Sequence, residues 1–463
     1  MAKNQPSRLP AGRLRCGRAG WLLALIAVGV AAYGQEADEA PETEPAAAEP
    51  VTTEDAAALG EGIEVPREEY LSRLEAQIVL VDLVREGRFE EALPVAQNMV
   101  DLTAAEFGRP SVEVATALSN LAVIQRNLEH YEDSNVSFQD AIEMFREVEG
   151  PFTESIISPL ISLGANYHAT GDYPQALGIF QEARTVNRRA YGLLNEDQID
   201  IVYHVAATLT SMRRYEEAHE QQQDALNIME RVHATDTLEI VPYIYGYAEW
   251  LISAFQFEAG RVQYVRAMDI VRAREGVDSP SLIVPLSEIG NSYRAQKLAE
   301  GRGISSLKRA LEIAEMGTDK LVLARVLRDI GDWYTAFSRV GATGQEYVRA
   351  WQLLGDVEDG ETIRQEWFAE PGYVLREYPS SRGLADPGDP GVVPGHVLVA
   401  FDVDEEGDPL NAVVIEAEPA GFKDDTMLRA IRRSRFRPRV VDGELVYATG
   451  IVRNFSFHYD PDQ

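Results

Sequence analysis

Cysteine is almost absent from this sequence. Its single cysteine, Cys16, lies in an N-terminal stretch that we expect to be removed from the mature protein. A chain without cysteine can form no disulfide, no thiolate nucleophile and no cysteine-ligated zinc or iron–sulfur site. These kinds of chemistry are therefore excluded for the mature chain.

Basic residues are also scarce. Lys and Arg number 43 against 75 Asp and Glu, which gives a formal net charge of −32. A surface with this sign repels the phosphates of nucleic acids, so we expect no nucleic-acid partner. Hydrophobic residues at 45% and charged residues at 25% are nevertheless typical of folded domains, and 463 residues suggest at least two of them.

Long apolar runs are lacking as well. Residues 21–32 form an apolar run of only twelve residues, preceded by basic residues and followed by Tyr33-Gly34. This arrangement is typical of a secretory signal peptide, and the run is short for a bilayer that requires about 20 apolar residues. We therefore predict a cleaved signal peptide at 1–34 and a periplasmic protein. The alternative is a leader that stays uncleaved as an inner-membrane anchor and supplies the membrane contact.

Residues 35–66 contain ten acidic residues, no basic residue and almost no bulky apolar side chain. Such a segment cannot bury enough apolar surface to offset the entropy lost on ordering it. We therefore predict a disordered acidic linker that leads into a domain beginning near residue 67.

A repeat of 42 residues occupies the region 67–366. Aromatic side chains recur with this spacing at Phe89, Tyr131, Tyr173, Tyr215 and Phe257. Small residues follow three positions later at Ala92, Ser134, Ala176, Ala218 and Gly260. Glycine keeps the same step at Gly108, Gly150, Gly192 and Gly276, with Ala234 in the missing place. Apolar residues at helical spacing, small residues at crossings and a terminal glycine predict helix pairs that stack into an all-α solenoid of about seven units.

These units resemble the tetratricopeptide repeat. The matching pieces are Leu163-Gly164-x-x-Tyr167, Gly171-Asp172-Tyr173-x-x-Ala176, and Phe180 with Ala183. The 42-residue period is similar to that of the kinesin-light-chain type of this repeat. The resemblance implies that the solenoid binds a protein or peptide, without indicating which one.

The first helix of each pair is expected to supply the inner face of the solenoid. Positions on that face combine aromatic, basic, amide and acidic side chains, which suit contact with a peptide. The candidate partner-binding residues are Arg126, His168, Tyr203, Tyr245, Glu249, Asn291, Arg294 and Arg328, and Asp332 shares the same face. The alternative interpretation is a solvated concave face with partly buried tyrosines.

The helical period ends near residue 367. Residues 367–394 are rich in proline and glycine and are expected to form a connector. In 395–463 apolar residues alternate with a period of two, as at Val397, Val399, Phe401 and Val403, which predicts a half-buried strand. A returning strand, one helix, an Asp442-Gly443 hairpin turn and a closing strand follow. We therefore predict a small α+β domain with one helix on an antiparallel sheet.

This region resembles the C-terminal domain of the TonB energy-transducer family. The matching pieces are Gly395-x-Val397-x-Val399-x-Phe401-x-Val403-Asp404-x-x-Gly407, Arg435-Phe436-Arg437-Pro438 and Gly450-x-Val452-x-x-Phe455-x-Phe457. The resemblance implies that the domain binds an extended segment of an outer-membrane transporter by adding a strand to its sheet. The family's usual membrane anchor carries a histidine that residues 21–32 lack, so the resemblance implies peptide docking rather than energy transduction.

Two sets of contact residues are expected in this domain. The accepting edge is expected in residues 451–459, with Val452, Asn454 and Ser456 as contact residues. The second set belongs to an arginine cluster and consists of Arg432, Arg433 and Arg435, close to Arg437 in the sequence. The alternative interpretation of the cluster is a solvated surface with local pairing to acids.

No pattern in the sequence indicates an enzyme. The seven histidines form no metal-binding pair, and nucleophile-elbow, P-loop and dinucleotide motifs are absent. We therefore expect no catalytic residue, no cofactor and no metal. The predicted function is that of a periplasmic interaction adaptor in the cell envelope. The alternatives are an anchored, atypical energy transducer and, last, an enzyme.

Overall fold

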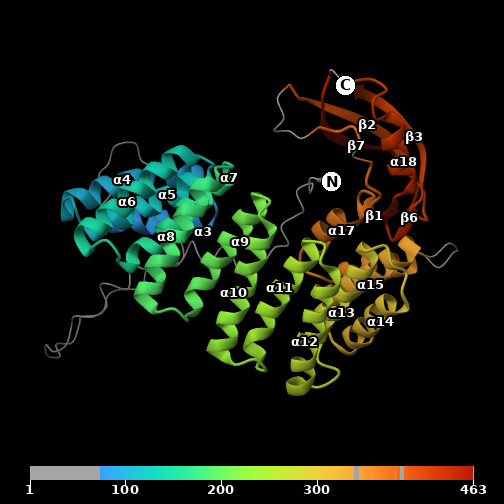
Figure 1. The fold of residues 1–463 in the computed structure, drawn as a ribbon, viewed down its shortest axis with the longest axis horizontal. Helices are drawn as coiled ribbons and strands as arrows, with labels where there is room; N and C mark the ends of the chain where they lie inside the picture. The colour runs from blue at the N-terminus through green and yellow to red at the C-terminus, as the bar shows by residue number, and fades with distance from the viewer. Residues whose placement is uncertain (1–72, 338–343, 381, 386–390, 462–463) are drawn as a thin grey trace, which may run out of the picture. The chain divides into compact units, whose positions relative to one another are not determined.

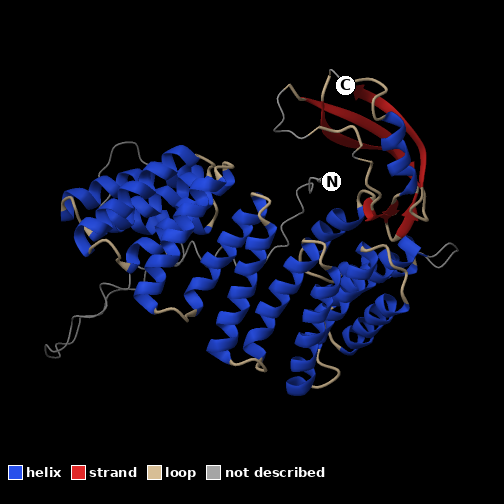
Figure 2. Cartoon of the chain, viewed as in Figure 1, coloured by secondary structure: helices blue, strands red, loops and turns tan. Residues whose placement is uncertain are grey.

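The computed structural model describes residues 73–337, 344–380, 382–385 and 391–461. The expected leader at 1–34 and the acidic linker at 35–66 lie outside these residues. The described chain divides into two compact units between residues 232 and 233. Figure 1 follows its helices and strands along the chain, and Figure 2 distinguishes helix from strand.

The first unit is built of helix pairs. Its helices are α3 (Arg73–Arg85), α4 (Phe89–Phe107), α5 (Val112–Asn127), α6 (Tyr131–Glu149), α7 (Ile157–Ala169), α8 (Tyr173–Tyr191), α9 (Ile199–Ser211) and α10 (Tyr215–His233). Short 3-10 helices, η1 (Glu154–Ile156) and η2 (Glu196–Gln198), lead into α7 and α9. Consecutive helices such as α5 and α6 pack against each other.

The second unit begins with further helix pairs. Its helices are α11 (Val241–Ser253), α12 (Phe257–Glu275), α13 (Ile283–Ala295), α14 (Gly301–Met316), α15 (Lys320–Phe337), α16 (Gln345–Leu354) and α17 (Gly360–Phe368). The 3-10 helices η3 (Leu238–Ile240) and η4 (Pro280–Leu282) lead into α11 and α13. Within the described chain, α3 to α16 make seven pairs. The predicted all-α solenoid is therefore confirmed.

The 42-residue step marks one structural position in successive units. Each recurring aromatic residue is the first residue of a 19-residue helix, namely α4, α6, α8, α10 and α12. Among the small residues three positions later, Ala92, Ala176 and Ala218 have no exposed surface. At Gly260 a Cβ atom would lie 2.6 Å from the Ile252 side chain, so α11 and α12 approach more closely than a larger residue allows.

The second helix of most pairs ends in a residue with a left-handed backbone. Gly108, Gly150, Gly192 and Gly276 have φ angles between +77° and +104°, and Ala234 takes the corresponding place with a φ of +69°. A second left-handed position recurs with the same step at Gly87, Glu129, Gly171, Arg213, Phe255 and Lys297. Because only glycine adopts this conformation without steric cost, the other residues carry local strain.

A three-stranded antiparallel sheet and one helix form the core of the C-terminal domain (Figure 2). The central strand β2 (Val393–Val403) lies between β3 (Pro409–Glu418) and β7 (Ala448–Tyr459). Helix α18 (Asp424–Arg433) covers one face of this sheet with its buried apolar residues. The buried side chains of this core are Val397, Val399, Phe401, Val403, Ala412, Met427, Ile431, Phe436, Phe455 and Phe457. The predicted antiparallel sheet with one helix is therefore confirmed.

Two short strand pairs complete the domain. Strand β5 (Arg439–Val441) pairs with β6 (Glu444–Val446) across Asp442-Gly443, whose φ angles of +51° and +81° fit the expected hairpin turn. Strand β1 (Gly372–Leu375) pairs with β4 (Arg435–Arg437), although β1 lies inside the stretch expected to be a connector. Proline and glycine indicated where helices end there, but they did not exclude a short strand with a buried Val374.

Candidate functional site

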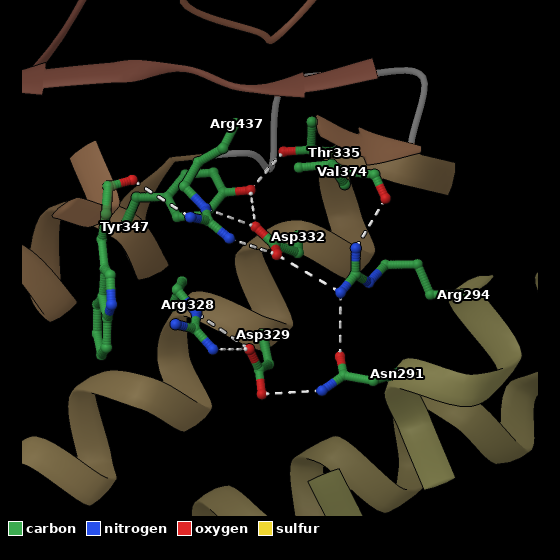
Figure 3. A network of polar contacts seen from close by, with 10 residues as sticks. Asn291, Arg294, Arg328, Asp329, Asp332, Thr335, Tyr347, Val374 and Arg437 are labelled. Carbon is green, nitrogen blue, oxygen red and sulfur yellow. Dashed lines mark hydrogen bonds and ion pairs between the residues drawn. The ribbon is translucent and has the colours of Figure 1, made fainter. Parts of the chain in front are cut away.

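A buried carboxylate, that of Asp332 on α15, is the centre of the polar network in Figure 3. Arg437 of β4 donates to both of its oxygens, with Nε 2.9 Å from Oδ1 and Nη2 2.7 Å from Oδ2. The hydroxyl of Tyr347 on α16 also donates to Oδ1, at 2.9 Å. The bidentate pairing of Arg437 with Asp332 is the strongest arrangement that an arginine and a carboxylate form.

Arg294 of α13 approaches the same carboxylate from the other side (Figure 3). Its Nη2 lies 3.6 Å from Oδ2 of Asp332, and its Nη1 donates to the carbonyl oxygen of Val374 at 2.7 Å. Val374 belongs to β1, so a residue of the helical array binds the backbone of the C-terminal domain directly. The C-terminal domain and α13 therefore share one network.

A second carboxylate, that of Asp329, extends the network along α15. Its Oδ1 accepts from Nη2 of Arg328 at 2.8 Å, and its Oδ2 accepts from the amide of Asn291 at 3.1 Å. The guanidinium of Arg328 also lies over the ring of Trp367, 4.3 Å from its centroid, which is a favourable cation–π geometry. Asn291, Arg294 and Arg328 are thus all occupied by contacts within the chain.

The charges in the network determine the protonation states of Asp332 and Arg437. Burial alone would raise the pKa of Asp332, but the guanidinium groups of Arg437, Arg294 and Arg328 hold this pKa at about 2. Burial would lower the pKa of Arg437, and the Asp332 carboxylate more than offsets this, so the pKa of Arg437 is raised. Both groups are therefore charged at neutral pH, and the pair is a fully formed buried salt bridge.

Apolar packing surrounds this salt bridge. Val440 of β5 is buried among residues of α15, α16 and α17, and Leu445 of β6 packs against the same group. At Gly407, which has a φ of +87°, a Cβ atom would lie 2.1 Å from the carbonyl oxygen of Phe436 and 2.8 Å from the Thr335 side chain. The C-terminal domain is therefore packed against the last helices of the array.

The remaining inner-face candidates in the first unit are Arg126, His168 and Tyr203. All three are neither fully buried nor fully exposed. The Nε2 atom of His168 lies 3.2 Å from the Ser211 hydroxyl, and burial lowers the pKa of this histidine. Binding of a partner by these residues stays a prediction.

The two inner-face candidates on α11 lie in different surroundings. The hydroxyl of Tyr245 donates to the carbonyl oxygen of Ser281 at 3.1 Å, and burial raises the pKa of Tyr245 to about 12. The Glu249 side chain is exposed, yet partial desolvation on this face raises the pKa of its carboxyl group. Both residues belong to a larger cluster that is described below.

The expected strand-accepting edge is in β7, the outer strand of the sheet. Among the described residues, the sheet neighbour of β7 is β2 alone. The carbonyl oxygen of His458 accepts from the backbone N–H of Ala385 at 2.9 Å, so this residue points its backbone groups away from β2. Along a strand, the N–H and C=O groups of every second residue face the same side. The backbone groups of Ser456 and Asn454 therefore also point away from β2. Asn454, Ser456 and Val452 are exposed.

The arginine cluster is divided by the structure. Arg435 forms an ion pair with Asp408, and Nη2 of Arg432 donates to the carbonyl oxygen of Ala412 at 3.4 Å. Arg433 is exposed, whereas Arg437 is turned into the buried network. The cluster therefore offers fewer free cations to a partner than its sequence suggests.

The key salt bridge was beyond sequence reasoning. Asp332 was placed on the inner face and Arg437 in the arginine cluster, but the two residues are 105 positions apart. No local spacing relates them. The sequence showed only that Asp332 is an acidic residue on the inner face and that Arg437 follows Phe436.

None of the helices in the described chain has the length and apolar character needed to cross a membrane. The described residues also hold no group of three or more His, Cys, Asp or Glu side chains that is placed to bind a metal ion.

Three parts of the chain match protein-family models. Residues 114–153 and 155–231 match tetratricopeptide repeat models. Residues 393–459 match the model of the Gram-negative bacterial TonB protein C-terminal domain. The chain therefore combines a tetratricopeptide-repeat array with a TonB C-terminal-like domain, as its sequence predicts.

Several solved structures are similar to this chain at low sequence identity. The kinesin light chain TPR-like repeats of Podospora anserina are 13% identical over 45% of this chain and 100% of that chain, with a TM-score of 0.39. BtubC from P. vanneervenii is 16% identical, covering 52% and 95%, with a TM-score of 0.37. Aspartyl phosphate phosphatase F from Bacillus subtilis is 13% identical, covering 64% and 70%, with a TM-score of 0.40. These values carry no information on function. No curated protein matches the chain.

Proposed function

We propose that the protein is a non-catalytic adaptor that acts in the periplasm. In this proposal the solenoid binds a protein or peptide partner, and the C-terminal domain docks an extended segment of a second protein. The matches to the repeat models and to the TonB C-terminal model support the two binding roles in general terms. An outer-membrane transporter is the source of the extended segment that the TonB resemblance implies.

The observation that carries the proposal is the outer edge of β7. Outward backbone groups at Asn454 and Ser456 can pair with an added strand, as in other cases of strand addition. Each new main-chain hydrogen bond contributes about 0.5–1.5 kcal/mol. With ordering costs subtracted, a segment of about five residues gives micromolar affinity, roughly −8 kcal/mol, which suits transient docking.

A proline at Asn454 tests strand addition. The full chain is used to capture proteins from an outer-membrane extract, and a synthetic peptide of the captured segment is then titrated. Asn454→Pro removes one outward N–H and fixes the backbone, so we expect at least about tenfold weaker binding. Asn454→Ala keeps the backbone donor and is expected to bind within about twofold of the unchanged protein. Equal affinity of Asn454→Pro, with an unchanged circular dichroism spectrum, contradicts strand addition at this edge.

A second candidate function is that of an atypical, membrane-anchored energy transducer. The TonB C-terminal match at 393–459 favours it. The two proposals differ in the fate of residues 1–34. N-terminal sequencing of the protein isolated from the envelope distinguishes them, because a start near Gln35 excludes the anchor and an intact leader supports it.

A further inference from the structure

Four side chains on α11, α12 and α13 form a cluster that the network around Asp332 does not use. They are Tyr245, Glu249, Tyr264 and Glu288, and they are called the Glu249–Glu288 cluster here. The rings of Tyr245 and Tyr264 lie 5.8 Å apart. Burial, followed by the charges of Glu288 and Glu249, raises the pKa of Tyr264 well above its usual value. The Tyr264 hydroxyl therefore lies within electrostatic range of both carboxylates.

The 42-residue repeat relates Tyr264 and Glu288 to an earlier pair of stacked side chains. Two units earlier, Phe180 stacks on His204 with the ring centroids 4.9 Å apart. Tyr264 and Glu288 occupy the corresponding two places, each 84 residues later in the sequence. The ring of Tyr264 thus takes the place of Phe180 between the helices, beside the position that Glu288 occupies.

The Tyr264 hydroxyl is an unusual buried group. Tyr264 has no exposed surface, and its hydroxyl has no hydrogen-bond partner in the described chain. The same holds for the hydroxyl of Ser287, which is buried next to Glu288 in the sequence. Buried polar groups are nearly always paired in native proteins, so the unpaired Tyr264 hydroxyl, within electrostatic range of two carboxylates, indicates a place where a hydrogen-bonding partner can bind.

The charges around Glu288 favour a cation. Burial, then the charges of Asp329 on α15 and Glu249 on α11, raises the pKa of Glu288 to about 7. Arg294 and a hydrogen bond from Asn291 act in the opposite direction. Arg294 is already held by Val374 and Asp332, so it does not neutralise the cluster. A positive ligand would relieve the repulsion between the two glutamates.

Building on the proposed function, we infer that the Glu249–Glu288 cluster receives a lysine or arginine side chain from an extended segment of the solenoid's protein partner. The two carboxylates accept hydrogen bonds from the cation, and the Tyr245 ring offers a face for it. The cluster spans the first helices of two consecutive units, α11 and α13, which suits a peptide lying across them rather than a small free amine. The partner is therefore a protein with a basic segment, complementary to this acidic chain.

A pair of peptide libraries tests this inference with the full chain. One library consists of fluorescent decapeptides with a central lysine and otherwise uncharged, varied residues. The other is identical but has norleucine in place of lysine. We expect the lysine library to bind at least about tenfold more tightly, because norleucine supplies neither the positive charge nor the N–H donors that the two carboxylates accept.

Variants locate the effect. Glu288→Gln and Tyr264→Phe are expected to weaken binding of the lysine library about tenfold and about threefold and to leave the norleucine library unchanged. Glu143→Gln, which removes one exposed carboxylate from α6, is the matched control and is expected to change neither. Circular dichroism checks that each variant is folded, and Tyr264→Phe keeps the buried ring in any case.

The pH dependence provides an independent readout. The groups facing Glu288 are Glu249, Tyr264, Asp329, Asn291 and Arg294, and its pKa of about 7 governs the charge of the cluster near neutrality. Affinity for the lysine library should therefore increase between pH 6 and pH 8, as Glu288 loses its proton. Glu288→Gln should abolish this increase.

Each alternative outcome is decisive. Equal binding of both libraries at the solenoid overturns the inference and leaves the proposed function intact. Binding of free lysine amide or a polyamine with the same affinity as the lysine library overturns the peptide as occupant. Absence of binding by either library overturns the inference. If the full chain carrying Asn454→Pro also captures no partner from an envelope extract, the proposed role of the solenoid is contradicted as well.

Discussion

At the scale of single residues, Asp332 is expected to contribute most to the free energy of unfolding of the second unit. Asp332→Asn removes the charge that Arg437 and Arg294 share and leaves two guanidinium groups without their buried counterion. Breaking a buried ion pair from one side costs about 3–5 kcal/mol. We expect this loss in the free energy of unfolding of the second unit, measured by urea titration of the full chain.

An exposed ion pair supplies the control for this substitution. Asp356 pairs with Lys320 at 2.8 Å, and both side chains are exposed. Asp356→Asn is expected to leave the midpoint of the urea titration almost unchanged, because solvent screens such pairs. If the two variants unfold at the same urea concentration, the Asp332 network does not hold the C-terminal domain on the array.

A second prediction at this scale concerns Ala234. This residue adopts a left-handed backbone in the place where the other units have glycine. Ala234→Gly relieves this strain, and the gain of about 1–2 kcal/mol is reduced by the greater freedom of glycine in the unfolded chain. We expect a net stabilisation of about 0.5–1 kcal/mol, seen as a higher melting temperature.

The same substitution inside a helix should have the opposite sign. Ala273 is exposed near the end of α12, where glycine is a poor helix former. Ala273→Gly is expected to destabilise by about 1 kcal/mol. Destabilisation by both variants would show that the Ala234 side chain contributes packing that outweighs its backbone strain.

At the element scale the repeat spacing carried the most information. The aromatic residue of each unit predicted the repeat, and the structure shows that it is the first residue of the second helix, as Tyr173 is of α8. The glycines that follow the second helices, such as Gly192, were predicted from the repeat, whereas the left-handed turn between paired helices holds Arg213 or Phe255 in some units and was not predicted. Neighbouring packing imposes the turn there, and no local signal in those residues indicates it.

The small residues of the repeat lead to a prediction about helix crossings. Ala176 on α8 is fully buried against α7. Ala176→Trp inserts a large ring at this crossing and should cost about 1–3 kcal/mol or more. Gln181→Trp adds the same side chain at an exposed position of the same helix and should cost little. Equal melting temperatures for the two variants contradict the assignment of Ala176 to the crossing of α7 and α8.

In the C-terminal domain, local sequence patterns predicted some strands and not others. Alternation along Val397 to Val403 and the Asp442-Gly443 turn predicted β2 and the β5–β6 hairpin. Strand β1 was missed because it is only four residues long, lies next to a stretch rich in proline and glycine, and pairs with β4, 60 residues further along the chain. The contacts of Arg294 with Val374 and of Arg437 with Asp332 depend on that long-range pairing, so no pattern within either segment could predict them.

At the scale of the whole molecule, charge links stability to pH. The chain carries a net charge of −32, and two carboxylates of the second unit, the buried Asp332 and the half-buried Glu288, have pKa values shifted in opposite directions. The pKa of Asp332 is about 2 instead of 3.8, because nearby arginines outweigh the effect of burial. The pKa of Glu288 is about 7 instead of 4.5, because burial and two neighbouring carboxylates disfavour its charge.

These two shifts predict a stability maximum in mild acid. The stabilisation from Asp332 is fully present above pH 3.8 and is lost as the pH falls toward 2. The penalty from Glu288 is absent below pH 4.5, where its carboxyl group is protonated in both states. It grows as the pH rises from 4.5 to about 7, because the unfolded state loses this proton while the folded state still holds it. The second unit should therefore be most stable near pH 4–5.

Thermal unfolding of the full chain between pH 2 and pH 8 measures this profile. The melting temperature should rise from pH 8 to about pH 5 and then fall steeply below pH 4. Glu288→Gln removes the penalty at its source, so its profile should be flatter between pH 5 and pH 8, whereas the fall below pH 4 should persist. The control Glu143→Gln changes the net charge by the same amount at an exposed site and should keep the original slope. If Glu143→Gln flattens the profile as much as Glu288→Gln does, the slope arises from the general repulsion of an acidic chain and not from Glu288.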